Sequence, residues 1–451
     1  MDTSVQAPMH SPEPKECINT FLLKEYQGIW YFNNRREDAY RYKYSGGLAT
    51  YPQQHVPIAC YSRILHKTFF VYGAAAEHDG SIVNAIGYYN HTSGRFSESR
   101  GLLYRQTFDA HYNPTLSIDD QGYLYIFANC HGRGMEGKPD DPLHGKAYIL
   151  RSVEPGATDQ FEVIKVDNFS YSQVWHLGSQ GMLHLHTRYN EQGHRHLYAS
   201  QSADGFCWSE PQPLASAGQG HYMISWSDGH RVVVAMDYHP HAGGQGNRTN
   251  LYVIKTDNAG QTWETMGGET LSLPLDSPQN PALVLDGEAR GTLIYLKDID
   301  FTEDGGVVVL YLESHSADPG PAGDPRRVRI ARWNEGRWTH HDVDGTDHNY
   351  DHGSLWTPPG KPWRVIFPTA PGPQPGATGG EMVMYESTDG GRSWQRGRNI
   401  TPGAERNHSY LRKVWQGHDD MIALWADGHP LEPSLSHLYC CNREGMVTRL
   451  P

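Results

Sequence analysis

The sequence predicts an all-β protein, a seven-bladed β-propeller that forms one domain over residues 1–451 with an N-terminal extension at residues 1–25. Its 48 glycines, 29 prolines and 11% aromatic residues suit many short strands joined by turns better than packed helices. A hairpin pattern also recurs seven times along the chain, and turns that contain aspartate and tryptophan follow several of the hairpins. Together these features predict a ring of small sheets.

The hairpin pattern is clearest at residues 109–131. Residues 115–118 and 123–127 are of strand-forming types, and Asp119, Asp120 and Gly122 between them favour a turn. Six similar pairs of strands surround this one, so the seven turns centre near residues 66, 121, 180, 230, 304, 360 and 418. Repeats of this size indicate propeller blades, which run to roughly 40–50 residues in well-known families.

Three segments that follow hairpins share a turn motif. They read SADGFCW at residues 202–208, TDNAGQTW at 256–263 and STDGGRSW at 387–394. These segments resemble the Asp-box of sialidase-type propellers, S-x-D-x-G-x-T-W. We expect a tight turn capped by serine and aspartate side chains, with the tryptophan packed between neighbouring sheets, and therefore a structural role.

Composition excludes several classes of function. The net charge of -13 argues against nucleic acid or an anionic membrane as the main partner, although a local basic cleft is compatible with it. The six cysteines form no CxxC motif, so neither a disulfide framework nor a cysteine zinc site is indicated. No apolar run approaches the roughly 20 residues that span a bilayer, and residues 1–16 lack the apolar core of a signal peptide. We expect a cytoplasmic monomer as the sequence is written, or a secreted one if it is a mature form.

The open ends of the hairpins should meet on one side of the propeller, because equivalent strands share their direction around the axis. The second hairpin places His111 and His131 there, and the third places Tyr171 and Arg188 symmetrically about its turn. The fourth hairpin offers Tyr222 and Tyr238 with His221 and His239 beside them, and Arg248 follows in the next loop. We expect Asp351, His352, His408, Tyr410, Asp427 and His429 of later hairpins to be ordinary turn residues.

This set of side chains suits proton abstraction next to a carboxylate. Arginine binds a substrate carboxylate through two hydrogen bonds and, with histidine, spreads the charge of an enolate-like intermediate. A histidine or tyrosine can remove the proton, and a second one can protonate the leaving oxygen. Such a β-elimination at a uronic acid cleaves a sugar chain without water.

The pattern D-x-H-x-N-P, I-D-x-x-G-Y and a second histidine twenty residues after the first, followed by S-Y-x-Q and an arginine, resembles the BNR-type seven-bladed propeller polysaccharide lyases. This family includes the ulvan lyases and the rhamnose-glucuronate lyases. The resemblance implies a carbon-oxygen lyase for an anionic oligo- or polysaccharide, most specifically at a rhamnose-glucuronate linkage. It makes His111 and His131 catalytic or charge-neutralising, Tyr171 an acid/base and Arg188 the carboxylate partner.

The resemblance also implies a weaker set of substrate-binding residues. Arg248 resembles a further family arginine, and Tyr238 a later family tyrosine; we place Tyr222 and His239 with them in the expected pocket. The chemistry requires no cofactor, although some family members carry a structural calcium or zinc ion. Here His239 and His241 form the only short metal-like spacing that we find.

Two other functions remain open from the sequence. One is a glycoside hydrolase of the rhamnosidase or sialidase kind, which generally needs two carboxyl groups beside the bond, and Asp351 with Asp427 is the only pair to nominate. The F/Y-R-I-P start of sialidases is absent. The other is a carbohydrate-binding propeller without catalysis.

Overall fold

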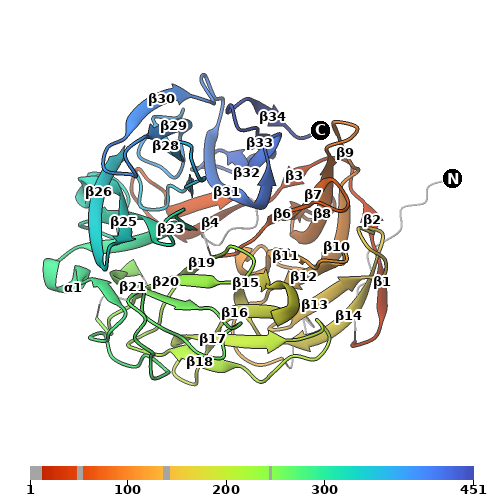
Figure 1. Ribbon diagram of the computed structural model, residues 1–451. Coiled ribbons are helices and arrows are strands. Elements are labelled where there is room, and N and C mark those ends of the chain that lie inside the picture. The colour runs from red at the N-terminus through yellow and green to blue at the C-terminus, as the bar shows by residue number, and fades with distance from the viewer. Residues whose placement is uncertain (1–12, 48–53, 136–142, 243–245) are drawn as a thin grey trace.

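The computed structural model describes residues 13–47, 54–135, 143–242 and 246–451. It is an all-β structure in which small antiparallel sheets surround a common centre (Figure 1). The described residues contain one short α-helix, α1 (Gly287–Arg290), and a few 3-10 turns. No helix among them is both long and apolar enough to span a bilayer. The predicted fold class is therefore confirmed at the level of an all-β, propeller-like ring of sheets.

Seven antiparallel hairpins form where the sequence predicts them. Their strands are rich in β-branched and aromatic residues, and most side chains in them are buried because the sheets pack face to face. The hairpins are β6 (Ala59–Ser62) with β7 (Lys67–Ala75), β11 (Pro114–Ile118) with β12 (Leu124–Ala128), β15 (Ser170–His176) with β16 (Met182–Tyr189), β19 (Met223–Ser227) with β20 (Val232–Tyr238), β23 (Leu293–Phe301) with β24 (Val307–Ser314), β27 (Ser354–Trp356) with β28 (Trp363–Ala370), and β31 (Asn407–His418) with β32 (Met421–Gly428).

Further strands extend each hairpin outward into a sheet. They are β8 (Ile82–Asn90), β9 (Arg95–Phe96) and β10 (Arg100–Tyr104) on the first, β13 (Ala147–Ser152) and β14 (Gln160–Asp167) on the second, β17 (Arg195–Ser202) and β18 (Gln212–Ala215) on the third, β21 (Thr249–Thr256) and β22 (Leu283–Leu285) on the fourth, β25 (Arg326–Asn334) and β26 (Arg337–Thr346) on the fifth, β29 (Glu381–Ser387) and β30 (Gln395–Asn399) on the sixth, and β33 (Ser436–Cys441) and β34 (Val447–Arg449) on the last.

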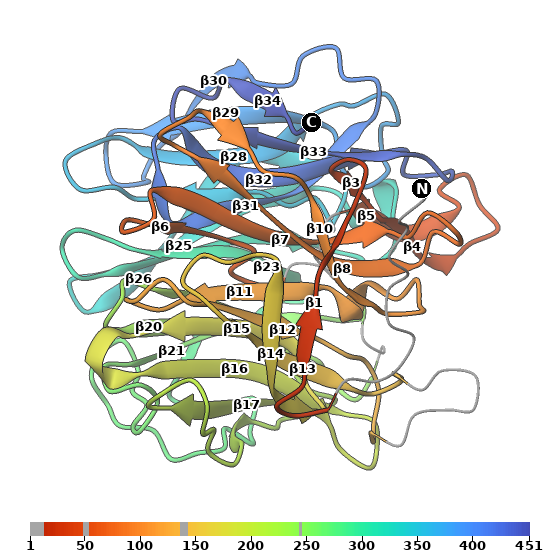
Figure 2. The same cartoon turned by 90° about the vertical axis from the view of Figure 1, so that its right-hand side faces the viewer.

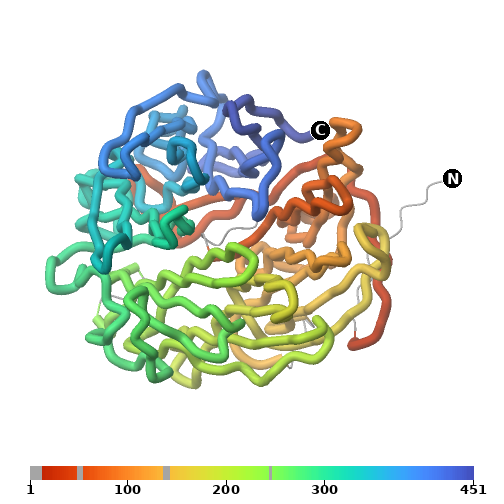
Figure 3. The backbone as a smooth tube through the Cα atoms, viewed as in Figure 1, coloured from red at the N-terminus to blue at the C-terminus, as the bar shows by residue number. Residues whose placement is uncertain are grey.

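The first and last hairpins belong to one continuous 11-stranded sheet that closes the ring. The short strand β3 (Gln27–Gly28) pairs with both β33 and β7, and β6 contacts β31 in parallel through Cys60 and Trp415. The backbone trace accordingly shows the C-terminus beside the first sheet (Figure 3). Part of the segment expected to be an extension also joins sheets, because β1 (Cys17–Asn19) pairs with β14 and β2 (Phe21–Leu22) pairs with β10.

An additional hairpin is formed by β4 (Trp30–Arg35) and β5 (Tyr42–Gly47). It lies at the end of the sheets where the seven hairpins open, to the right in Figure 2, which we call the mouth end. Tyr44 stacks on Tyr350 with ring centroids 3.9 Å apart, and Tyr31 stacks on Tyr410 at 6.3 Å. These contacts bury a cluster of tyrosines contributed by several sheets. The hairpin therefore covers the centre of the mouth end and leaves openings to its side.

The three turns that resemble Asp-boxes share a hydrogen-bonding pattern. Ser387 Oγ accepts from Gly391 N at 2.9 Å, and Asp389 Oδ1 accepts from Ser393 N at 3.0 Å. Ser202 with Asp204 and Thr256 with Asn258 make equivalent bonds in the other two turns. Trp208 packs edge-on against Phe127 of the preceding sheet. The side chains of these turns thus satisfy backbone N–H groups that the strands leave unpaired.

Candidate active site

His111 and His131 lie together at the mouth of the second hairpin, as the sequence predicts. Their rings stack in parallel with centroids 3.6 Å apart and an interplanar angle of 11°. His111 lies in the 3-10 turn Ala110–Tyr112, whose N-cap Asp109 accepts from His111 N at 3.0 Å. The same carboxylate contacts Nδ1 of His111, and it contacts Nδ1 of His131 at 2.5 Å. One aspartate therefore orients both imidazoles.

The charges of this group follow from burial and from mutual contact. Burial, helped by His131 and Arg195, lowers the pKa of His111 to about 3 although Asp109 opposes the shift. Burial alone would raise the pKa of Asp109, but the two imidazoles beside it hold that pKa well below its usual range. At neutral pH Asp109 is thus ionised and His111 neutral. Each Nδ1 donates its proton to the carboxylate, which leaves the Nε2 lone pairs for other partners.

A tyrosine and an arginine extend the group away from Asp109. Tyr189 Oη lies 3.1 Å from His131 Nε2, so its hydroxyl can donate to the imidazole. The same oxygen accepts from Arg195 Nη2 at 3.0 Å and Nε at 3.3 Å. Tyr189 and Arg195 face one another across the β16–β17 pair. The result is a continuous line of hydrogen bonds from Asp109 through His131 and Tyr189 to Arg195.

A cavity of about 410 Å³ opens beside the histidines. His131 has 35% of its side chain exposed, whereas His111 has 5%. The β4 strand forms the opposite wall, which no pattern in the sequence predicts. The cavity is lined by Tyr31, Phe32, Asn33, Asn34, Phe108, Asp109, Ala110, His111, His131 and Arg195.

Arg188 faces a neighbouring cavity of about 580 Å³ that it shares with Tyr189 and Arg133. Its Nη2 donates to both oxygens of Asp167 at 2.9 Å, and its Nε contacts His186 Nε2 at 3.3 Å. The expected arrangement, in which Arg188 and the two histidines face one pocket, is therefore replaced by two adjacent cavities. Arg195 is the arginine that lies beside the histidines.

Tyr171 lies next to His111 but beneath the cavity. Its ring centroid is 5.1 Å from that of His111, and the side chain has no exposed area. It adopts a left-handed backbone conformation with φ 55°, at an irregular register in β15. The guanidinium of Arg195 lies over its ring at 5.2 Å. Tyr171 is thus well placed to support His111 and Arg195 from below.

The four predicted substrate-binding residues are buried deeper in the structure. Arg248 lies over the rings of Tyr222 at 4.2 Å, Tyr295 at 4.9 Å and Tyr350 at 5.1 Å, beneath the β4–β5 hairpin. His239 Nε2 lies 3.2 Å from Asp237 Oδ1, and the same carboxylate accepts from Tyr222 N at 2.6 Å. The exposed fractions of Tyr222, Tyr238, His239 and Arg248 are 2%, 7%, 0% and 2%, and none of the four is among the residues that line the histidine cavity.

The carboxyl pair nominated for a hydrolase is occupied by structural contacts. Asp351 is fully buried and accepts from Gly379 N at 2.7 Å and from Thr346 Oγ1. Asp427 is 5% exposed and accepts from His437 N at 2.7 Å and Tyr439 Oη at 2.9 Å. Neither is among the residues that line the four cavities described among residues 13–47, 54–135, 143–242 and 246–451, and both carboxylates are engaged in structural hydrogen bonds.

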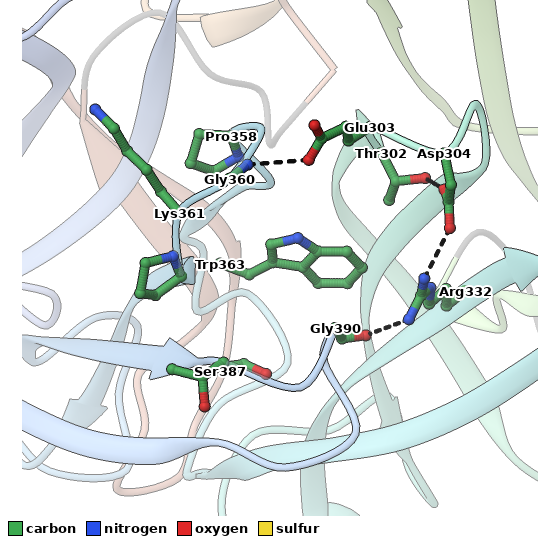
Figure 4. A pocket seen from close by; sticks show the side chains of 12 residues that line it. Thr302, Glu303, Asp304, Arg332, Pro358, Gly360, Lys361, Trp363, Ser387 and Gly390 are labelled. Atoms are coloured by element: carbon green, nitrogen blue, oxygen red, sulfur yellow. Dashed lines mark hydrogen bonds and ion pairs between the residues drawn. The ribbon is translucent and has the colours of Figure 1, made fainter.

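Another cavity, of about 600 Å³, lies at the opposite end of the sheets between two hairpin turns (Figure 4). Trp363 projects into it, and the guanidinium of Arg332 lies 4.9 Å from the tryptophan ring. Arg332 already pairs with Asp304 at 3.0 Å, and Glu303 accepts from Gly360 N at 3.0 Å. Arg332, Asp304 and Glu303 therefore have partners, and no histidine is among the residues that line the cavity.

Two groups of side chains have the composition of a metal site among the described residues. One is Asp109 with His111 and His131, and the other is His91, His418 and Asp420 at the turn end of the sheets. The predicted spacing of His239 and His241 belongs to neither, because His239 is buried beside Asp237 and His241 is exposed.

These features define a propeller-like all-β protein with a mouth-end site built from histidine, tyrosine and arginine. The chain belongs to the BNR repeat-containing family, whose model matches residues 72–346. It is 22% identical over 286 residues to an ulvan lyase of Alteromonas sp. (strain LOR), covering 56% of this chain and 58% of that one. It is 25% identical over 260 residues to an ulvan lyase of Nonlabens ulvanivorans, covering 52% and 54%. The chain thus spans somewhat more than half the length of these relatives.

Solved structures resemble the fold over nearly the whole chain. A PL25 ulvan lyase structure superposes with a TM-score of 0.68 at 16% identity, covering 94% of this chain and 96% of the other. The structure of the polysaccharide lyase Uly1 gives a TM-score of 0.65 at 12% identity, covering 94% and 100%. At these identities the likeness establishes the shared fold.

Proposed function

We propose that this protein is a carbon-oxygen lyase that cleaves a uronic-acid-containing oligo- or polysaccharide by β-elimination. The observation that supports the proposal most strongly is the hydrogen-bonded line from Asp109 through His131 and Tyr189 to Arg195. It combines a proton acceptor, a hydroxyl acid and a buried cation, which are the three groups that this elimination needs.

The two mouth cavities give a sugar chain a path across this line. His131 lines the first cavity and Tyr189 lines the second, and the two side chains are hydrogen bonded. A chain that occupies both cavities therefore passes over the His131–Tyr189 pair. Arg188 in the second cavity is placed to contact an acidic neighbouring sugar when Asp167 yields part of its pairing. The four predicted substrate-binding residues, which are buried, then support the site from beneath the cavities.

In the proposed reaction Tyr189 removes one proton from the substrate and gives one proton to the leaving group. Tyr189, having passed its proton to His131 Nε2, takes the proton at C5 of the uronate while Arg195 stabilises the phenolate and the enolate-like charge. The bond between C4 and the leaving oxygen then breaks, and a double bond forms between C4 and C5. The proton held by Tyr189 goes to the leaving oxygen, so no water is consumed. Tyr189 thus takes the acid/base role that the family resemblance gives to Tyr171.

The finer assignment is a rhamnose-glucuronate linkage of the ulvan or arabinogalactan type, in a seven-bladed propeller with Asp-box turns. The names of the relatives support the linkage, since they are ulvan lyases and one PL25 structure holds a GlcA(1-4)Rha3S unit. The seven paired hairpins and the shared turn hydrogen bonds support the architecture.

The test is incubation of the purified chain with ulvan, gum arabic and glucuronate oligosaccharides while the ultraviolet absorbance of an unsaturated uronate is recorded. Growth of this chromophore, with product masses that show no added water, supports the lyase. Cleavage without the chromophore and with oxygen-18 incorporation from water would instead indicate a hydrolase. Binding that is unchanged in His131→Ala, with no cleavage, would indicate a carbohydrate-binding propeller.

A further inference from the structure

A second group of histidines lies at the turn end of the sheets, away from the mouth cavities. His66 lies in the β6–β7 turn and His91 directly follows β8, whereas His418 ends β31 and Asp420 lies in the turn before β32. His66 and His91 belong to the first hairpin and the strands beside it, whereas His418 and Asp420 belong to the last hairpin. Residues more than three hundred positions apart in the sequence are thus brought together where the ring closes.

The donor atoms of three of these residues converge. His91 Nδ1 lies 3.4 Å from Asp420 Oδ2, and His418 Nδ1 lies 3.3 Å from the same oxygen. One ligand atom from each of the three residues lies within 4.8 Å of the others. A tetrahedral zinc ion with bonds of about 2.0–2.1 Å holds its ligand atoms about 3.3 Å apart. The two nitrogen–oxygen distances, 3.4 Å and 3.3 Å, match this value.

A hydrogen-bonding contact behind His91 is compatible with the tautomer that a metal requires. Thr68 Oγ1 lies 2.8 Å from His91 Nε2, so an Nε2–H can donate to the hydroxyl and leave the Nδ1 lone pair directed at Asp420. His91 has no exposed side-chain area, and Thr68 is also fully buried. Nδ1 of His418 carries a lone pair as well, since it accepts from Asp420 N at 3.2 Å. That weak bond gives way when a metal binds.

We propose that His91, His418 and Asp420 bind a zinc ion that links the first and last hairpins of the ring. Two imidazole nitrogens and one carboxylate oxygen are ligands that zinc accepts, and water completes the tetrahedron. The exposed His66 ring lies 5.7 Å from that of His91 and 5.6 Å from that of His418, which makes it the nearest imidazole that can replace the water.

The position of the site gives the ion a structural task. At this point β6 pairs with β31 through one parallel bridge, Cys60 to Trp415, and β3 pairs with both β33 and β7. An ion held by both hairpins adds a further link between them. Because it binds the folded chain and finds no assembled site in the unfolded one, it raises stability by an amount that grows with the free zinc concentration.

The experiment strips the full-length protein with a chelator, removes the chelator and titrates zinc chloride, with bound zinc per chain and Tm as readouts. We expect one equivalent to bind and Tm to rise. Asp420→Ala, at a residue whose side chain is 55% exposed and which should fold normally, loses that equivalent and the rise in Tm. Thr68→Val keeps the shape of the side chain and removes the hydroxyl, so it should weaken zinc binding about 10–100-fold.

Two control variants separate this site from the rest of the molecule. His230→Ala changes an exposed histidine in the corresponding turn of the β19–β20 hairpin and should bind zinc as the parent does. His111→Ala removes a member of the other candidate triad and should also retain the equivalent. Failure of the parent chain to bind zinc would overturn the proposal. So would an equivalent that survives Asp420→Ala but is lost in His111→Ala. None of these outcomes depends on the proposed lyase activity.

Discussion

The two ends of the sheets carry similar triads with different geometry. At the mouth, Asp109 contacts Nδ1 of both histidines closely, and the rings stack in parallel 3.6 Å apart. At the turn end, Asp420 lies 3.3–3.4 Å from both nitrogens, and the rings of His91 and His418 tilt by 46°. In the closer triad the carboxylate contacts both imidazoles directly, and the line of hydrogen bonds continues into Tyr189 and Arg195. We therefore expect the same residue types to serve proton transfer at one end and metal binding at the other.

The largest expected effect comes from removing the proton acceptor at the mouth. His131→Ala breaks the line between Asp109 and Tyr189, and general acid-base catalysis typically contributes 10²–10⁴-fold. We expect kcat to fall by about 10³-fold while zinc content stays unchanged. Rates of formation of the unsaturated product report the first quantity, and metal analysis reports the second. Unchanged activity would remove His131 from the reaction.

The next comparison is between the two arginines of the mouth. Arg195→Ala removes the buried cation beside Tyr189, and loss of one such electrostatic stabiliser typically costs about 10²–10³-fold in kcat. Arg188→Ala should mainly raise KM, since Arg188 lines the second cavity and is already paired with Asp167. Steady-state kinetics on a uronate oligosaccharide separates the two effects. If Arg188→Ala is the variant that loses kcat, the carboxylate partner is the one that the family resemblance implies.

The sequence predicts the hairpins and the histidine pair for a clear physical reason. Alternating strand residues on both sides of a turn fix the register, so His111 and His131 fall at one mouth. The place of Arg195 cannot be predicted in this way, because it lies on the third strand of its sheet. The pairing of Arg195 with Tyr189 depends on the length of the loop between the two strands. The wall formed by β4 and the pairing of Arg188 with Asp167 depend on contacts between segments that no local pattern specifies.

A smaller effect should appear in the pH dependence of stability. Burial lowers the pKa of His111 and of His186 to about 3, from 6.5 in an exposed histidine. Between these values the unfolded chain binds protons that the folded chain excludes, so the free energy of unfolding falls as pH drops from about 6.5 towards 3. Each such histidine contributes up to about 1.4 kcal/mol per pH unit.

Urea unfolding of the parent and of His186→Asn at several pH values in this window checks the expectation. The variant should lose stability less steeply as pH falls, because it removes one buried group that resists protonation. His230→Ala, at an exposed position, should have the same slope as the parent. Equal slopes for the parent and His186→Asn would show that His186 makes no such contribution.

The smallest effect should come from a turn that serves only the fold. Ser387→Ala removes the hydroxyl that accepts from Gly391 N, and a typical net hydrogen bond contributes about 1 kcal/mol to stability. We expect the free energy of unfolding to fall by about that amount while kcat, KM and zinc affinity stay at the parent values. Ser209 Oγ accepts from Gln201 N at 2.9 Å at an exposed site, so Ser209→Ala removes the same type of hydrogen bond and should cost no more than Ser387→Ala. A loss of activity in Ser387→Ala without a loss of stability would show that the turn end takes part in function, and the division between the two ends would fail.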